Sequence, residues 1–256
     1  MLEAVHLTKR YASLPAVQDL SFSLRPGEVL GCLGPNGSGK STTVKMLTGL
    51  LQPTRGAVLF AGHDIQDNLA AYRKRLGYVP EEAHLYPYLS GWEYLELIGI
   101  LRGMDHKRLP IKIDSLLELF SLHPSRHASI SSYSKGMRQR LLLIAAIMDN
   151  PEIFIFDEPL SGLDVTSALI FKNLVQELGQ QGKLVFYCSH MLEVVEKVCS
   201  DVLILRKGVV IAQDSVANIG QILGQSLENT FLHLVDEVDT VSVARNIVDV
   251  MQMRAA

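Results

Sequence analysis

Two short stretches of this chain carry side chains that suit phosphate chemistry. The first, GPNGSGKST at Gly34–Thr42, matches the pattern GxxxxGK[ST] with Gly34, Gly39, Lys40 and Ser41. Glycines keep side chains out of the way, so backbone N–H groups can surround a phosphate. The lysine can reach terminal phosphates, and the Ser41 hydroxyl can bind Mg²⁺. A glycine-rich turn that binds nothing is the alternative, but the complete motif between an expected strand and an expected helix favours a phosphate site.

The second stretch, EIFIFDE at residues 152–158, ends in two carboxylates. Its apolar residues predict a buried strand that delivers Asp157 and Glu158 to the carboxyl end of a sheet, where open α/β folds bind their ligands. There Asp157 can hold Mg²⁺ through water, and Glu158 can polarise the water that attacks a phosphate. Alone, the pair fits a solvated turn equally well. Beside a phosphate loop, it predicts a hydrolytic site.

A third candidate is His190, which closes the strand-like run LVFYCSH at residues 184–190. A lone histidine is more often structural or simply exposed. Its position at the carboxyl end of another strand of the same sheet nevertheless directs it to the same crevice. An imidazole there could hydrogen-bond a γ-phosphate.

The surrounding sequence alternates between strand and helix patterns. Apolar runs bounded by turn residues predict strands at residues 28–34, 56–62, 152–158, 183–190 and 201–213. Helices are predicted after the phosphate loop, from about Gly91 and at residues 165–178, and Ser90 and Glu93 have capping-box spacing. Residues from about 84 to 148 read almost wholly as helix and loop. We therefore predict an α/β fold with a mainly parallel sheet, helices on both faces and an inserted helical subdomain.

The overall composition fits a folded domain rather than a nucleic-acid-binding or membrane-spanning chain. The chain has 256 residues, of which 48% are hydrophobic and 20% charged, and its net charge is −3. A large core is therefore expected, and no nucleic-acid partner is, because nucleic-acid binding needs a dense basic face. The longest apolar runs, such as Leu141–Met148, are too short to span a bilayer. No signal peptide is evident at the N-terminus.

Cysteine usage points to a reducing compartment. Cys32, Cys188 and Cys199 form no CxxC pair. Cys32 and Cys188 lie in apolar strand-like runs, which favours buried free thiols. An odd count without metal-ligand spacing agrees with thiols that stay reduced.

A basic loop, YSKGMRQR at residues 133–140, runs directly into the apolar helical run LLLIAAIM. Ser134 could be no more than the cap of this helix. The backbone N–H groups from Lys135 onward also lie at the start of the helix, which makes them an anion site.

Taken in order, these residues resemble an ATP-binding cassette (ABC) ATPase, the nucleotide-binding subunit of an ABC transporter, over roughly residues 2–235. The resemblance implies a P-loop NTPase-type fold with an N-terminal antiparallel β portion. It implies that Tyr11 stacks on adenine, although a tyrosine after TKR is often just a packed aromatic. It implies that ATP and Mg²⁺ bind along the phosphate loop, through Gly34, Pro35, Asn36, Gly37, Ser38, Gly39, Lys40, Ser41 and Thr42.

The same resemblance gives the basic loop a role in a second subunit. In a head-to-tail dimer, Ser134, Lys135, Gly136 and Met137 would cap the ATP held by the phosphate loop of the partner. The phosphate loop already has a helix N-terminus of its own, so the second one is free to serve the partner. SGLD at residues 161–164 is similar to the family's D-loop, and its Asp164 would lie at the dimer interface.

The chain departs from the family pattern at two places. The family's signature is commonly LSGGQ, where this chain has YSKGM, so Lys135 adds a positive charge and Met137 loses a polar contact. The family usually has a glutamine where this chain has Glu81, a residue expected to touch Mg²⁺ or the attacking water. A carboxylate can still bind Mg²⁺, but it would repel an unshielded γ-phosphate. Both departures resemble the export-type, ABC-2-like branch.

The resemblance also implies the organisation and the partners of the protein. We expect one ABC ATPase domain at residues 1–235, with the helical subdomain at about 84–148, and a short C-terminal helical tail at 236–256. The subunit would hydrolyse ATP to energise a separate membrane permease as a homodimer, on the cytoplasmic face of the cell membrane. The aromatic stretch His84–Leu97 would receive the permease, although a subdomain core explains any one of its aromatics equally well.

Two other functions fit the same residues. An ABC-type ATPase can serve a soluble assembly, such as iron–sulfur cluster assembly, and co-purification with membranes discriminates that case. A regulator that binds ATP and barely hydrolyses it is the other, for which Glu81 and Lys135 are the only hints. The transported substrate is not readable, because cassettes do not contact it.

Overall fold

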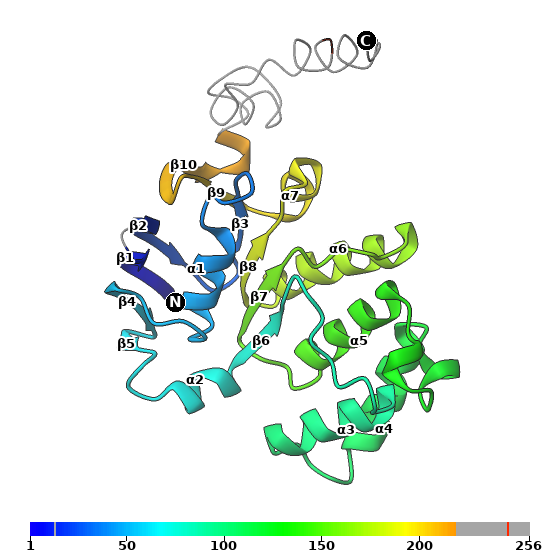
Figure 1. The fold of residues 1–256 in the computed structure, drawn as a ribbon. Coiled ribbons are helices and arrows are strands. Elements are labelled where there is room, and N and C mark those ends of the chain that lie inside the picture. The colour runs from blue at the N-terminus through cyan, green and yellow to red at the C-terminus, as the bar shows by residue number, and fades with distance from the viewer. Residues whose placement is uncertain (13, 219–244, 246–256) are drawn as a thin grey trace, which may run out of the picture.

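The computed structural model describes residues 1–12, 14–218 and 245, and two sheets organise them (Figure 1). Sheet A is antiparallel, in the order β2-β1-β4-β5. Its strands are β1 (Leu2–Tyr11), β2 (Leu14–Leu24), β4 (Arg55–Phe60) and β5 (His63–Asp64). The antiparallel β portion expected near the N-terminus is confirmed.

Sheet B has six strands in the order β10-β9-β3-β8-β7-β6. All neighbours are parallel except β9 and β10, which form a hairpin. Its strands are β3 (Val29–Leu33), β6 (Leu76–Val79), β7 (Ile153–Asp157), β8 (Leu184–Cys188), β9 (Asp201–Arg206) and β10 (Val209–Ser215). The continuous apolar runs of the central strands follow from this topology, because parallel strands covered on both faces alternate between two cores.

Helices connect the parallel strands and cover both faces of sheet B (Figure 1). They are α1 (Lys40–Leu47), α2 (Leu69–Lys74), α3 (Gly91–Arg102), α4 (Leu109–Leu119), α5 (Lys135–Ile147), α6 (Val165–Gln180) and α7 (Leu192–Val198), with short 3₁₀ helices at His123–Ser125 and Ile130–Ser132. Helix α1 lies between the two sheets. The predicted α/β fold is confirmed. The sequence patterns missed α2, α7 and the strands β5 and β6, all of which are short.

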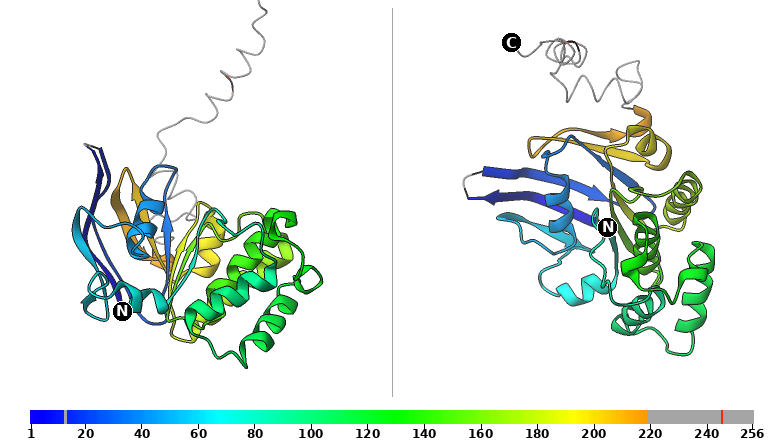
Figure 2. Two further views of the ribbon diagram at one scale, coloured as in Figure 1. Left: turned by 60° about the horizontal axis from the view of Figure 1, so that its bottom comes forward. Right: turned by 45° about the vertical axis from the view of Figure 1, so that its right-hand side comes forward.

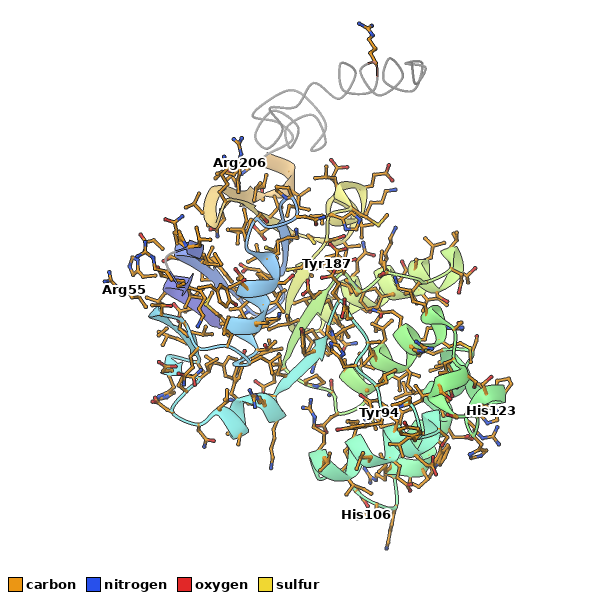
Figure 3. The ribbon with its side chains drawn as sticks, in the orientation of Figure 1. Arg55, Tyr94, His106, His123, Tyr187 and Arg206 are labelled. Carbon is orange, nitrogen blue, oxygen red and sulfur yellow. The ribbon has the colours of Figure 1, made fainter. Side chains whose placement is uncertain are left out.

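A hydrophobic core lies on each face of sheet B. The first fills the space between the sheets around α1, where Phe22 of β2 stacks on Phe186 of β8 at 5.4 Å. The second lies on the opposite face, under α5, α6 and α7, and contains Phe156, Phe171 and Tyr187. Tyr187 lies near the middle of the molecule (Figure 3). Sheet B is therefore held from both sides, which keeps the carboxyl ends of its strands in register.

Helices α3, α4 and α5 form the helical subdomain, on the far side of sheet B from sheet A (Figure 2). A third core fills it, with Tyr94 and Leu95 of α3 against Ile113 of α4. Helix α3 starts at the predicted capping box, in which Ser90 and Glu93 bond reciprocally. Arg102 at its end donates to the carbonyl oxygens of Arg73, Lys74 and Leu76 and so ties the subdomain to α2 and β6.

Helix α5 belongs to two cores at once. Leu142 and Leu143 pack in the core under sheet B, and Leu141 and Ile144 pack in the core of the subdomain. A helix that is apolar on most of its circumference is typically buried. α5 is thus the rigid connection between the two parts. The predicted C-terminal helical tail, residues 236–256, lies outside the described residues except for Arg245.

Candidate functional site

The phosphate loop connects β3 to α1, as the motif predicted. Gly37 and Gly39 have φ values of 78° and 108°, in the region that favours glycine. A Cβ on Gly39 would lie 2.7 Å from the carbonyl oxygen of Ala16, so the loop has no room for a side chain there. These glycines therefore leave the N-terminus of α1 open.

Lys40 is the first residue of α1, and its side chain turns back along the loop. Its Nζ donates to the carbonyl oxygens of Gly34 at 2.6 Å and Pro35 at 3.2 Å. The residue is only 8% exposed. The two carbonyls are neutral, so they do not cancel the positive charge of the buried ammonium. Lys40 can therefore still attract an anion.

The loop is also held by the β9–β10 hairpin. Gly208, in the turn of that hairpin, donates its N–H to the carbonyl oxygen of Ser38 at 2.9 Å and accepts from Gln18 of β2 at 2.7 Å. Ser38 is buried, and its Oγ has no hydrogen-bond partner among the residues that the structure describes. A buried orphan hydroxyl is rare in folded proteins, and beside open N–H groups it suits contact with a bound oxyanion.

The loop and the predicted carboxylates line one cavity of about 240 Å³. Asp157 ends β7, next to Cys188 of β8, so the parallel register delivers it to the cavity. The residues that line the cavity are Ala16, Asn36, Gly37, Ser38, Gly39, Lys40, Ser41, Thr42, Glu81, Asp157 and Glu158. Gly34 and Pro35 of the loop are absent from this lining, and their carbonyl oxygens accept hydrogen bonds from Lys40.

The carboxylates of Glu81, Asp157 and Glu158 line the same cavity, and their charges affect the pKa of Asp157. Asp157 is 4% exposed. Burial, with a further contribution from the charges of Glu81 and Glu158, raises the pKa of Asp157 from 3.8 to about 6. A cation or a polarising metal ion in the cavity would reverse this effect, because it favours the carboxylate form.

The carboxylate of Glu158 also contacts two residues that are absent from the cavity lining. Its Oε1 lies 2.8 Å from Nδ1 of His190, and the Ser189 hydroxyl donates to Oε2 at 3.4 Å. Glu158 itself adopts a left-handed backbone with φ 48°. The structure therefore places His190 beside the carboxylate of Glu158 rather than in the cavity lining.

The signature loop lies outside the cavity of its own chain. Ser134 caps α5 by accepting a hydrogen bond from the N–H of Met137 at 3.2 Å. Asp164 caps α6 in the same way, through Ser167, and those hydrogen bonds hold its pKa below the usual range. Gly136 packs on Gly162, where an added Cβ would lie 2.6 Å from the carbonyl oxygen. The signature loop and the SGLD segment thus form one surface.

Tyr11 ends β1, and 51% of it is exposed. Lys9 lies over its ring at 5.8 Å. The residue is absent from the cavity lining, whereas Ala16, on the neighbouring strand, is part of it. Sequence reasoning missed Ala16, Ser189 and Gly208, because none of these small residues carries a sequence signal of its own. The three cysteines are free and buried, as predicted.

Comparison with known proteins agrees with the site. A family model described as "ABC transporter" matches residues 17–161. The ABC transporter ATP-binding protein NatA of Bacillus subtilis (strain 168) is 33% identical over 205 residues, which cover 80% of this chain and 83% of that protein. The linearmycin resistance ATP-binding protein LnrL of the same organism is 36% identical over 224 residues, 88% of this chain and 72% of that protein.

Solved structures give the same answer. The ATP-binding subunit of an ABC transporter superposes with a TM-score of 0.86 at 30% identity, over 91% of this chain and 99% of that one. A dimeric ATP-binding cassette in a post-hydrolysis state, bound to ADP and Pi, superposes with a TM-score of 0.78 at 25% identity, over 84% and 98%. The chain belongs to the ABC transporter family, as an ATP-binding subunit that hydrolyses ATP to energise a transporter.

Proposed function

We propose that this chain hydrolyses ATP in the cavity between the phosphate loop and the end of β7, with Glu158 as the base. The observation that carries the proposal is that Lys40, Ser41, Asp157 and Glu158, from two separate stretches of sequence, line one cavity. The phosphate loop supplies N–H donors and Lys40 for the β- and γ-phosphates. Ser38 would use its unpartnered hydroxyl in the same place.

The donor set of the cavity fits Mg²⁺. A hydroxyl on Ser41 and carboxylates on Asp157 and Glu81 are hard oxygen ligands, and phosphate oxygens complete such sites. When bound, the ion would neutralise charge on the transferred phosphoryl group. We assign Ser41 and Asp157 to it, with Glu81 as an additional oxygen donor in the position where the family usually carries glutamine.

The chain's own residues would then do the following. Glu158 accepts the proton of the attacking water through one carboxylate oxygen, while His190 beside the other oxygen holds the group in place. His190 would also hydrogen-bond the γ-phosphate on closure. Tyr11 would stack on the adenine ring.

The functional unit we propose is a homodimer with two ATP molecules between its subunits. Ser134 to Met137 are absent from the lining of their own chain's cavity, which supports a role at the partner's nucleotide. Asp164 would lie at the same interface. The dimeric cassette among the similar structures agrees with this arrangement.

The membrane partner would be a separate permease, through which this chain would be held on the inner, cytoplasmic face of the cell membrane. Among the residues that the structure describes, no helix is long and apolar enough to cross a bilayer. Tyr86 and Tyr88, in the aromatic stretch after Glu81, are exposed and available to a partner. We propose the export direction because of YSKGM and Glu81, and the similarity to a resistance protein supports it.

Phosphate release by the full-length chain tests the base. Glu158→Gln should slow hydrolysis by about 10²- to 10⁴-fold, because it removes the proton acceptor, while ATP binding survives. The matched control is Glu152→Gln, which makes the same change just before β7, at the other end of the same strand. Turnover of Glu158→Gln at the wild-type rate would refute the assignment.

A pull-down tests the partner. Tagged Glu158→Gln protein should be captured from native membranes in detergent with Mg·ATP, and co-purifying chains identified by mass spectrometry. A stoichiometric protein with several spans supports the transporter complex, and its number of spans tests the export-type placement. A soluble partner instead would favour an assembly such as iron–sulfur cluster assembly.

A further inference from the structure

Helix α5 makes a buried contact with the backbone that follows the proposed base. Gln139, in its second turn, is 3% exposed. Its Nε2 donates a hydrogen bond of 2.9 Å to the carbonyl oxygen of Pro159, the residue after Glu158. Nothing in the phosphate loop or in the two carboxylates requires this glutamine, so it calls for a separate explanation.

The backbone at Glu158 needs support from its surroundings. A φ of 48° is costly for a residue with a side chain, by roughly 1–2 kcal/mol, and it persists only where neighbours hold it. On one side, the Glu158 N–H donates to the carbonyl oxygen of Cys188 at 3.0 Å. On the other side, Gln139 holds the Pro159 carbonyl. The direction of the Glu158 side chain therefore depends on where α5 lies.

Further contacts join α5 to the segment Pro159–Asp164. Gly136 lies against the backbone of Gly162, and the stem of Lys135 would meet a Cβ on Gly162 at 2.9 Å. Arg140 and Asp164 line a second cavity, separate from the phosphate cavity, and Nη1 of Arg140 donates to the carbonyl oxygen of Phe120 at the end of α4. Helix α5 and this segment are therefore packed directly against each other.

We propose that Gln139 is a positioning residue for hydrolysis, which passes the position of the signature helix α5 to Glu158 through the Pro159 carbonyl. This inference rests on the proposed function, in which Glu158 is the base and Ser134 caps the partner's ATP. Ser134, which would cap the partner's ATP, begins the same helix that carries Gln139 and its bond to Pro159. An ATP bound against the signature loop of one subunit would therefore fix the position of Glu158 in that same subunit. Gln139 thereby couples the two nucleotide sites.

If Gln139 positions Glu158, its loss should affect the rate of hydrolysis and the stability of the fold to different extents. Loss of the Gln139 donor leaves the buried Pro159 carbonyl unpaired, which costs about 1–3 kcal/mol, so most of the protein stays folded. A displacement of a reacting group by about 1 Å, in contrast, can cost about a hundredfold in rate. Substitution of Gln139 should therefore lower kcat far more than it lowers the folded fraction or ATP affinity.

The test compares Gln139→Met with Gln176→Met in the full-length chain. Methionine has a similar shape but no donor. Gln176 makes the same kind of bond, from Nε2 to the carbonyl oxygen of Lys197 at 2.7 Å, between α6 and α7. We expect Gln139→Met to lower kcat by about tenfold to a hundredfold with little change in KM, and Gln176→Met to leave both near wild type. Urea unfolding should show that both variants stay folded under the assay conditions.

A double variant shows whether Gln139 acts through Glu158. If it does, Gln139→Met in a Glu158→Gln background should slow hydrolysis no further, because the group it positions is already gone. Full multiplication of the two effects would overturn the inference, as would a Gln139→Met protein that turns over at the wild-type rate. Should Gln139→Met fail to fold, Gln139→Asn, which keeps the amide but shortens the reach, decides by the same readouts.

The outcomes also separate this inference from the proposed function. If Glu158→Gln hydrolyses ATP normally, the assignment of the base is wrong and the inference falls with it. If Glu158→Gln is inactive but Gln139→Met is as fast as wild type, only the positioning role is wrong.

Discussion

The Nδ1 atom of His190 lies 2.8 Å from Oε1 of Glu158, across the ends of two neighbouring parallel strands. Glu158 is largely buried, whereas 70% of the His190 side chain is exposed. The exposed ring thus covers a carboxylate that faces the phosphate cavity on its other side. This arrangement lets the histidine hold Glu158 in one rotamer without filling the space that a nucleotide needs.

His190→Ala should therefore slow ATP hydrolysis without abolishing ATP binding. We expect kcat to fall by about tenfold to a hundredfold, because the carboxylate loses the group that orients it. Phosphate release and titration with a fluorescent ATP analogue measure the two effects. A loss of affinity as large as the loss of rate would instead indicate that the ring mainly contacts nucleotide. His6→Ala, which removes an exposed histidine paired with Asp19 in sheet A, is the control.

Lys40→Ala should weaken ATP binding. A charge-assisted hydrogen bond is worth about 1.5–3 kcal/mol, which corresponds to a loss of affinity of about tenfold to a hundredfold. Lys45→Ala removes the same charge from an exposed position of α1 and should bind ATP nearly as wild type does. Equal affinities for all three proteins would show that Lys40 serves only to hold the carbonyls of Gly34 and Pro35.

Asp157 makes the stability of the nucleotide-free protein depend on pH. Because its folded pKa is raised to about 6, the native protein holds a proton between about pH 4 and pH 6 that the unfolded chain has lost. The free energy of unfolding should therefore fall as the pH rises through this window, by at most about 3 kcal/mol. Asp157→Asn should lose this dependence. Urea unfolding in EDTA at several pH values measures it, and parallel curves for the two proteins would contradict the prediction.

Gly136→Ala should destabilise the protein, although alanine favours helices. Helix propensity alone predicts a gain of up to about 1 kcal/mol. The added Cβ would lie 2.6 Å from the Gly162 carbonyl oxygen, so α5 and the SGLD segment must separate, at a cost of about 1–3 kcal/mol. The sign of the change in the urea midpoint decides between the two effects.

The sequence by itself predicted the family of this protein and most of the residues that line its cavity. The phosphate loop is contiguous, and its glycines, Lys40 and Ser41 lie in the loop and the helix that they themselves form. Asp157 and Glu158 were recognisable because an apolar run precedes them, and such a run ends at the ligand-binding edge of a parallel sheet. The alternation of strands and helices predicted the α/β fold for the same reason, since each pattern reflects local periodicity.

Only the tertiary structure decided how these parts hold one another. Gln139 and Pro159 are 20 residues apart, and Gly208 braces Ser38 from a hairpin at the other end of the chain. Neither pair leaves a pattern in the sequence, because a single hydrogen bond between distant residues has no period and no fixed spacing. His190 was placed at the right edge by its strand, but its contact with Glu158 followed from the register of β7 and β8. Local sequence sets the elements and their reactive groups, whereas packing sets the distances between them.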